Sequence, residues 1–304
     1  MSKRTLALIG ATIVSLIYGL TFTVAKDVMP LYINAYGFIV MRVFGATVLF
    51  WIVSFFMTFF RKKENNIEYL KKEDFPRIIA CAFFGVAVNM LAFFKGLSYT
   101  SPISASVLMV STPIIVLILS SILLKEKMQK RKISGIILGL VGTAFLILYG
   151  KSVGNAPNAT LGNFLIFVNA VSYGFYLIIV RKLMDKYNAF LFVKWIYLFG
   201  FLMVLPFGWN EFVAINWTVI PSNMYWRIGF IVIFSTFFTY LLNLLSMREL
   251  KPTTVAVFIY LQPVFATIFA IGLGKDELNF VKVIAAILIF VGVFLVTVSP
   301  RTIS

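Results

Sequence analysis

Long apolar stretches constrain this chain more than any other feature of its sequence. Each has about 20 residues, which is the length that a helix needs to cross the hydrocarbon core of a bilayer. That core offers no water to backbone N–H and C=O groups, so the stretches are expected to be helices with internal hydrogen bonds. The sequence therefore predicts an all-α membrane protein with ten transmembrane helices. The expected helices span about 5–25, 35–60, 76–98, 102–124, 132–150, 161–183, 187–208, 225–247, 252–274 and 279–299.

Composition supports a membrane protein and excludes several other classes. Apolar residues make up 61% of the 304 residues and charged residues only 12%, about half the charged share of a soluble domain. There is no histidine and one cysteine, Cys81, which excludes a disulfide within the chain, a histidine-based metal site and a serine–histidine relay. We therefore expect no enzymatic activity, no catalytic residue, no metal site and no cofactor.

The distribution of basic residues predicts the orientation in the membrane. The net charge of +16 does not indicate nucleic-acid binding, because Lys and Arg lie between the apolar stretches and not on a soluble domain. The connections 61–77, 125–132 and 181–186 are rich in Lys and Arg, whereas the alternating connections hold few. Cytoplasmic loops carry this excess in membrane proteins. We expect a multi-pass protein of the plasma (inner) membrane with both termini in the cytoplasm.

The chain contains an internal duplication. The segment 102–142 recurs at an offset of about 150 residues, and features near the N-terminus recur at an offset of about 155. We expect two five-helix repeats, at 1–150 and 151–304. Because five is odd, the two repeats enter the membrane in opposite directions and form an inverted pair. Corresponding residues include Pro102 and Pro252, Pro113 and Pro263, Gly142 and Gly292, and Tyr18-Gly19 and Tyr173-Gly174.

Pro113 and Pro263 lie near the middle of expected helices. Proline removes one backbone hydrogen bond and pushes against the carbonyl four residues earlier, here that of Met109 or Ile259. In a membrane such a break persists only where protein or a wet cavity satisfies the freed carbonyl. Matched breaks in corresponding places of two halves are typical of a transport site, so both prolines are predicted hinges.

Two cations, Arg42 and Lys194, lie deep within expected helices, where charges are costly and usually functional. All Asp and Glu residues lie in connections or at helix ends, so none is expected beside these cations. Two cations that face a cavity would favour an anionic group such as a substrate carboxylate. The alternative is that each cation is structural, with Arg42 bonding helix-end carbonyls and fixing only the packing.

Polar and aromatic residues that repeat across the halves predict a central pocket. Residues spaced by four positions share one helix face, and others adjoin the mid-helix prolines or glycines that allow close helix approach. Hydrogen bonding between helices, at under about 2 kcal/mol per contact, is the alternative explanation. The predicted substrate-binding residues are Tyr18, Arg42, Asn89, Phe93, Thr112, Tyr173, Lys194, Thr239, Asn243 and Gln262.

One set of motifs runs through both halves of the chain, namely Tyr18-Gly19, Arg42, Gly45, 96–100, Pro113, Lys125-Glu126, Gly135, Gly142, Pro263, Asp276 and Gly292. This set resembles the EamA-like branch of the drug/metabolite transporter superfamily. The sequence departs from that pattern at Ala285, where the first copy has Gly135, and at Asp276, where the family usually has Glu. The resemblance implies ten helices in inverted halves and the export of amino acids or movement of other small metabolites.

The leading functional hypothesis is a small-metabolite transporter that exports amino acids or related metabolites by alternating access. The alternatives are a permease for a vitamin, nucleobase or drug-like compound, and a non-transporting receptor or scaffold. The expected partners are a small-molecule substrate and the lipid bilayer, with no nucleic acid. The chain is expected to be a monomer or homodimer, because the stripe Gly135, Gly139 and Gly142 can pack helices within one subunit or between two.

Overall fold

The computed structural model describes residues 2–60, 70–124, 130–149, 158–184, 186–250, 258–259 and 261–297. Over these residues the chain is helical, and no strand occurs among them. Predictions that involve residues 125–129, 251–257 and 298–304, including Lys125, Glu126 and Pro252, lie outside the described residues. The all-α fold class is confirmed.

Four long helices are continuous α-helices, and two further rods each contain a short π-helical segment. The continuous helices are α1 (Lys3–Val28), α2 (Ala35–Phe60), α8 (Ala159–Met184) and α9 (Ala189–Val213). The first interrupted rod is α3 (Phe75–Ala82), η2 (Phe83–Ala87) and α4 (Val88–Tyr99), and the second is α10 (Ser222–Val232), η4 (Ile233–Phe238) and α11 (Thr239–Glu249). The other helices are α5 (Pro102–Met109), α6 (Thr112–Leu124), α7 (Lys130–Tyr149), α13 (Leu261–Gly272) and α14 (Phe280–Thr297), with short 3-10 turns η1 (Lys72–Asp74) and η3 (Trp217–Val219).

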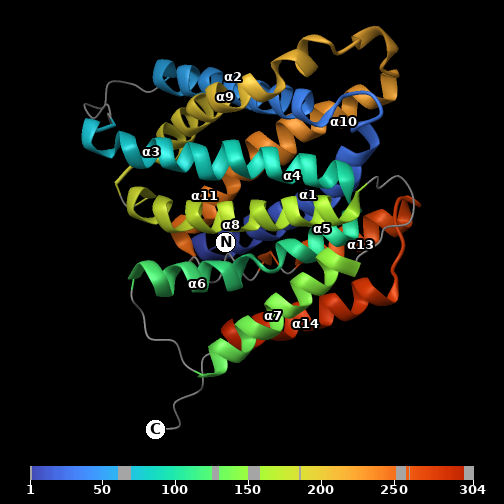
Figure 1. Ribbon diagram of the computed structural model, residues 1–304. Helices are drawn as coiled ribbons and strands as arrows, with labels where there is room; N and C mark the ends of the chain where they lie inside the picture. Colours follow the sequence, from blue (N-terminus) through green and yellow to red (C-terminus); the bar gives the residue numbers. More distant parts are fainter. Residues whose placement is uncertain are drawn as a thin grey trace.

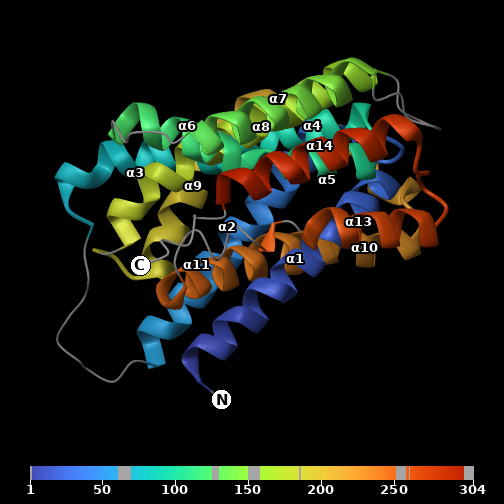
Figure 2. The same ribbon diagram turned by 90° about the horizontal axis from the view of Figure 1, so that it is seen from below.

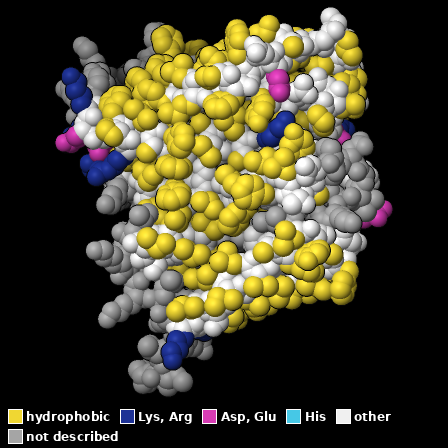
Figure 3. Space-filling model, viewed as in Figure 1, with side chains coloured by type: hydrophobic (Ala, Val, Ile, Leu, Met, Phe, Trp, Pro, Cys, Tyr) yellow, Lys and Arg dark blue, Asp and Glu magenta, His cyan; other side chains and the backbone are white. Residues whose placement is uncertain are grey.

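The helices meet the requirements of a multi-pass membrane protein. Within the described residues, seven helices are long and apolar enough to cross a bilayer, and three shorter apolar helices lie at 133–146, 261–272 and 280–292. Hydrophobic side chains cover most of the face drawn in Figure 3, and many charged ones gather toward its left edge. An apolar outer surface of this extent suits lipid and not water.

The connections between helices gather at two ends of the bundle (Figures 1 and 2). One end holds Asp27 and Asp276 and is called the Asp27 end. The other holds Asp74 and is called the Asp74 end. Between the ends, α2 packs on α9 and α7 on α14, while α4 packs on α8 and α11 on α1. Helices 150 to 155 residues apart correspond to each other, namely α1 and α8, α2 and α9, α4 and α11, and α7 and α14. The α2–α9 and α7–α14 pairs therefore each join two corresponding helices, and the α4–α8 pair corresponds to the α11–α1 pair.

Glycines permit two of the closest helix contacts. A Cβ atom built on Gly292 of α14 would lie 2.6 Å from the carbonyl oxygen of Gly135 on α7, and one built on Gly142 would lie 2.8 Å from Leu288 Cβ. The glycine stripe of α7 therefore packs against α14 of the same chain. Gly19 plays a similar part in α1, where an added Cβ would lie 2.4 Å from Phe265 Cβ.

The helix break expected at Pro113 is present. Helix α5 ends at Met109, and α6 begins at Thr112 after the turn Val110-Ser111. The Thr112 hydroxyl donates to the Met109 carbonyl at 2.7 Å, so a side chain supplies the donor that the proline lacks. Pro263 likewise lies in the first turn of its helix, as the third residue of α13, which starts at Leu261.

Candidate functional site

A cavity of about 110 Å³ lies between the helices that the duplication pairs. Residues from α1, α2, α4, α8, η4 and α11 line it, and Met109 and Ile259, the residues four positions before the two prolines, also belong to its wall. The matched helix breaks thus border one shared space. The structure brings seven of the predicted residues together there, namely Tyr18, Arg42, Asn89, Phe93, Tyr173, Asn243 and Gln262.

Arg42 is held firmly on the cavity wall. Its Nε donates to the Thr236 hydroxyl at 2.5 Å, and its Nη2 donates to the Ser235 carbonyl at 3.0 Å. The guanidinium also lies 4.4 Å from the centre of the Phe94 ring. The residue is 4% exposed, and no ion pair among the described residues involves it. Arg42 therefore bonds one backbone carbonyl, which lies within a rod and not at a helix end, and its positive charge is left without a described carboxylate.

Two side chains that line the cavity donate hydrogen bonds to backbone carbonyls in the two π-helical segments. A π-turn widens the helix by one residue and disturbs the regular pattern of backbone hydrogen bonds. The Tyr240 hydroxyl donates to the Gly85 carbonyl in η2 at 3.0 Å, while Arg42 serves the Ser235 carbonyl in η4. The segments begin 150 residues apart, at Phe83 and Ile233. Their positions agree with the duplication.

Helix α8 presents one polar and aromatic face to this region. Asn169 and Tyr173 lie four residues apart, and Tyr176 follows one turn later, so all three share a face and line the cavity. Asn169 Nδ2 donates to the Asn89 carbonyl at 2.8 Å, and Asn243 Nδ2 donates to the Tyr173 hydroxyl at 3.4 Å. The sequence analysis did not select Asn169, Tyr176 or the lining residue Tyr240. Asn169 and Tyr176 lie four and three residues from Tyr173, and this spacing could have placed them on the same helix face as Tyr173.

Three predicted residues lie outside the cavity lining. Thr112 is used at the Pro113 break, as described above. The Thr239 hydroxyl donates to the Ser235 carbonyl of its own rod at 2.8 Å. Lys194 lies at the contact between α9 and α2, where its Nζ donates to Ser54 Oγ at 3.0 Å and sits over the ring of Trp51.

Ion pairs close the Asp27 end. Asp27, at the end of α1, pairs with Arg227 of α10 and, at 2.5 Å, with Lys275 just after α13. The Asp27 carboxylate is buried, with 4% of its side chain exposed. These contacts hold three segments from both halves together at one point.

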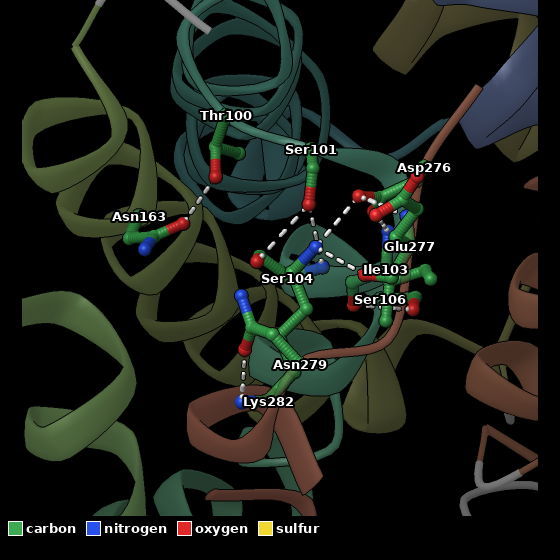
Figure 4. Close-up of polar contacts among 10 residues, drawn as sticks. All are labelled: Thr100, Ser101, Ile103, Ser104, Ser106, Asn163, Asp276, Glu277, Asn279 and Lys282. Carbon is green, nitrogen blue, oxygen red and sulfur yellow. Dashed lines mark hydrogen bonds and ion pairs between the residues drawn. The ribbon is translucent and has the colours of Figure 1, made fainter. Parts of the chain in front are cut away.

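A second charged cluster lies near the start of α5. Asp276 Oδ1 accepts a hydrogen bond from Lys282 Nζ at 2.6 Å, and both side chains are fully buried. Asp276 Oδ2 accepts from the backbone N–H of Ile103 at 3.1 Å, in the first turn of α5 (Figure 4). A carboxylate is favoured at this place because the first N–H groups of a helix lack internal partners. Asp276 thus fixes the segment after α13 to α5.

At the Asp74 end, one carboxylate joins two connections. Asp74 accepts from the Tyr187 hydroxyl at 2.8 Å and pairs with Lys186 at 3.1 Å. It also lies 3.5 Å from Arg77. The start of α3 is therefore attached to the connection between α8 and α9.

Known proteins share both the sequence pattern and the fold of this chain. A model of the EamA-like transporter family matches it twice, over residues 5–148 and 160–298. A solved crystal structure superposes with a TM-score of 0.65 at 15% identity, covering 99% of this chain and 100% of that one. This likeness concerns the fold alone.

Several relatives are named as transporters without a substrate. "Uncharacterized transporter YoaV" of Bacillus subtilis (strain 168) is 26% identical over 302 residues, which cover 95% of this chain and 96% of that protein. "Uncharacterized transporter YetK" of the same organism is 26% identical over 240 residues, covering 78% and 72% of the two chains. An "Uncharacterized transporter" of Archaeoglobus fulgidus is 28% identical over 227 residues, covering 75% and 79%.

Proposed function

Because the chain belongs to the EamA-like transporter family, we propose that it exports a small carboxylate-bearing metabolite, an amino acid or related acid, across the plasma (inner) membrane. Membership in this family makes it a multi-pass membrane transporter, and the cavity supports the class of solute. Export, and not uptake, is the direction that the family resemblance favours. The chain performs this work without enzymatic chemistry of its own.

The observation that carries the proposal is the charge of the cavity. Arg42 supplies a positive charge there, and the described lining contains no Asp or Glu. Ser235 lies beside it, since its carbonyl accepts from Arg42 Nη2, and the Ser235 hydroxyl has no partner among the described residues. A carboxylate can accept hydrogen bonds from both groups, and charge-assisted bonds of this kind are the stronger ones.

Alternating access follows from the duplication. We take the ten helices to form two inverted five-helix repeats with both termini in the cytoplasm, so that the Asp27 end faces outward. The ion pairs of Asp27 and the hydrogen bond from the Ile103 N–H to Asp276 then close the outer side, because they link the two halves. Opening to the outside requires them to break while the two halves rock about the cavity, with Pro113 and Pro263 at the bending points.

Counterflow in proteoliposomes tests the proposal. Vesicles are loaded with a mixture of unlabelled amino acids, and entry of radiolabelled amino acids is measured. We expect the parental protein to accumulate label and Arg42→Gln to lose most of it. Lys194→Ala is the matched control, because it removes a cation outside the cavity, and it should keep transport. Counterflow of nucleobases or neutral vitamins without any amino acid would contradict the proposal.

A further inference from the structure

Asn169 lies on the cavity face of α8 with its amide held in one orientation. Its Nδ2 donates to the backbone carbonyl of Asn89 at 2.8 Å. A carbonyl can only accept, so this bond fixes which end of the amide carries the oxygen. The residue is 1% exposed, and its Oδ1 has no hydrogen-bond partner among the described residues. Asn169 is therefore a fixed acceptor without a donor.

A second buried asparagine on the same helix has partners at both ends. Asn163 Oδ1 accepts from the Thr100 hydroxyl, as Figure 4 shows, and Asn163 Nδ2 donates to the Leu146 carbonyl at 2.9 Å. Asn163 does not line the cavity. The fold thus satisfies a buried asparagine away from the cavity and leaves one incomplete beside it. Buried polar groups without partners are rare and costly.

Two hydroxyls on the cavity wall already have partners. The Ser15 hydroxyl bonds the carbonyls of Ala11 and Phe258, and the Thr21 hydroxyl donates to the Ile17 carbonyl. Asn169 Oδ1 therefore differs from them in being oriented and unoccupied. It lines the same cavity as Arg42.

We infer that Asn169 Oδ1 accepts a hydrogen bond from an amino or hydroxyl group next to the carboxylate of the solute. The cavity then selects α-amino or α-hydroxy acids over plain carboxylates of the same carbon skeleton. Arg42 and Ser235 hold the acid, and Asn169 determines specificity by recognising the neighbouring donor. The inference rests on the proposed function, since it takes the carboxylate to be held by Arg42.

Two triplets of probes test the inference on the purified full chain. The first is alanine, lactate and propionate, and the second is leucine, 2-hydroxy-4-methylpentanoate and 4-methylpentanoate. Within each triplet the carboxylate and the carbon skeleton stay the same, and only the group next to the carboxylate changes from amino to hydroxyl to hydrogen. Binding isotherms should show the amino or hydroxy member of at least one triplet binding about tenfold to a hundredfold tighter than the plain acid, as expected for one hydrogen bond.

Three variants assign that preference to one side chain. Asn169→Leu should bring the amino and hydroxy members down to the affinity of the plain acid, whose own affinity stays within about twofold. The matched control Asn163→Leu should lower the melting temperature and keep the preference. Asn169→Asp retains an acceptor and adds a negative charge, so it should favour the amino member over the hydroxy member. This third variant provides the test if Asn169→Leu does not fold.

The outcomes separate this inference from the function on which it rests. Equal affinity for all members of a triplet in the parental protein, or a preference that survives Asn169→Leu, overturns the inference and leaves carboxylate transport standing. If Asn169→Leu does not fold, an unchanged ratio of amino to hydroxy affinity in Asn169→Asp overturns it as well. Absence of binding by every probe, together with absence of amino-acid counterflow, overturns the proposed function and the inference with it.

Discussion

At the scale of single residues, Arg42 both packs against η4 and supplies a positive charge. Different substitutions can separate these two roles. Arg42→Gln removes the charge and weakens the contact with the Ser235 carbonyl, so we expect lost carboxylate binding and about 1–3 kcal/mol of lost stability. Arg42→Lys keeps the charge without the planar fork and should recover part of the affinity. Thermal unfolding and binding isotherms measure the two effects. Unchanged affinity in Arg42→Gln alongside reduced stability would assign Arg42 to packing alone.

The predicted residues that line the cavity are those for which both the depth in the helix and the direction of the side chain fit. Counting along a helix gives the depth of a side chain, and this placed both Arg42 and Gln262 near the middle of the membrane. It does not give the direction in which a side chain points once helices are packed. Lys194 is also deep by count, yet it lies between α9 and α2. Asn169 was not predicted, although its face of α8 lines the cavity.

At the scale of helices, the broken segments α5–α6 and α13 should act as bending elements. Pro113→Ala and Pro263→Ala each restore a backbone donor and stiffen the break. We expect each to slow counterflow several-fold while the protein still inserts. Pro221→Ala is the control, since Pro221 precedes α10 at an exposed helix start, and it should transport normally. Parental rates in both test variants would mean that the breaks are inherited from the duplication and do not work as hinges.

The break at Pro113 also makes a thermodynamic prediction. Thr112→Val removes the hydroxyl that serves the Met109 carbonyl and should cost about 1 kcal/mol in the parental chain. In Pro113→Ala the new backbone N–H can take that carbonyl, so the same change should cost less. A double-mutant cycle followed by unfolding measures the difference. Strictly additive effects would contradict a shared acceptor.

The duplication made the helix breaks predictable, whereas the π-helical segments could not be read from the sequence. A proline lacks the backbone N–H that a helix needs at its position, so its effect is local and follows from the identity of that one residue. The segments at 83–87 and 233–238 carry no such mark. Donors from distant helices bond carbonyls within them, as Tyr240 does for Gly85 and Arg42 for Ser235. Only the folded bundle brings these groups together.

At the scale of the whole molecule, orientation is the first property to test. In a Cys81→Ser background, single cysteines at Lys130 and Val219 report the two ends. We expect a membrane-impermeant thiol reagent added to intact cells to label Val219→Cys and not Lys130→Cys. The basis is the excess of Lys and Arg in alternate connections. Labelling of Lys130→Cys from outside would reverse the topology.

Closure of the Asp27 end is the second property of the whole molecule. Asp27→Asn weakens the pairs with Arg227 and Lys275 and should shift the population toward an outward-open state. Thr21→Cys on the cavity wall, again in the Cys81→Ser background, reports access from outside. We expect labelling of this cysteine to be several-fold faster when Asp27→Asn is present. Asp74→Asn, at the opposite end, is the control and should not speed it. Equal rates in all three backgrounds would exclude Asp27 as part of an outer gate.

The paired π-helical segments have a consequence for how relatives should be aligned. Each segment holds one residue more than a regular helix of the same rise, and one residue turns a helix by about 100°. Asn89 and Asn243 line the cavity and follow these segments, so the extra residue contributes to the direction in which they point. A relative without the extra residue needs a one-residue gap at 83–87 or 233–238, although both helices read as uninterrupted. Alignments without gaps there would compare residues on different helix faces, and deletion of one codon in a transporter could turn a different face of the helix toward its cavity.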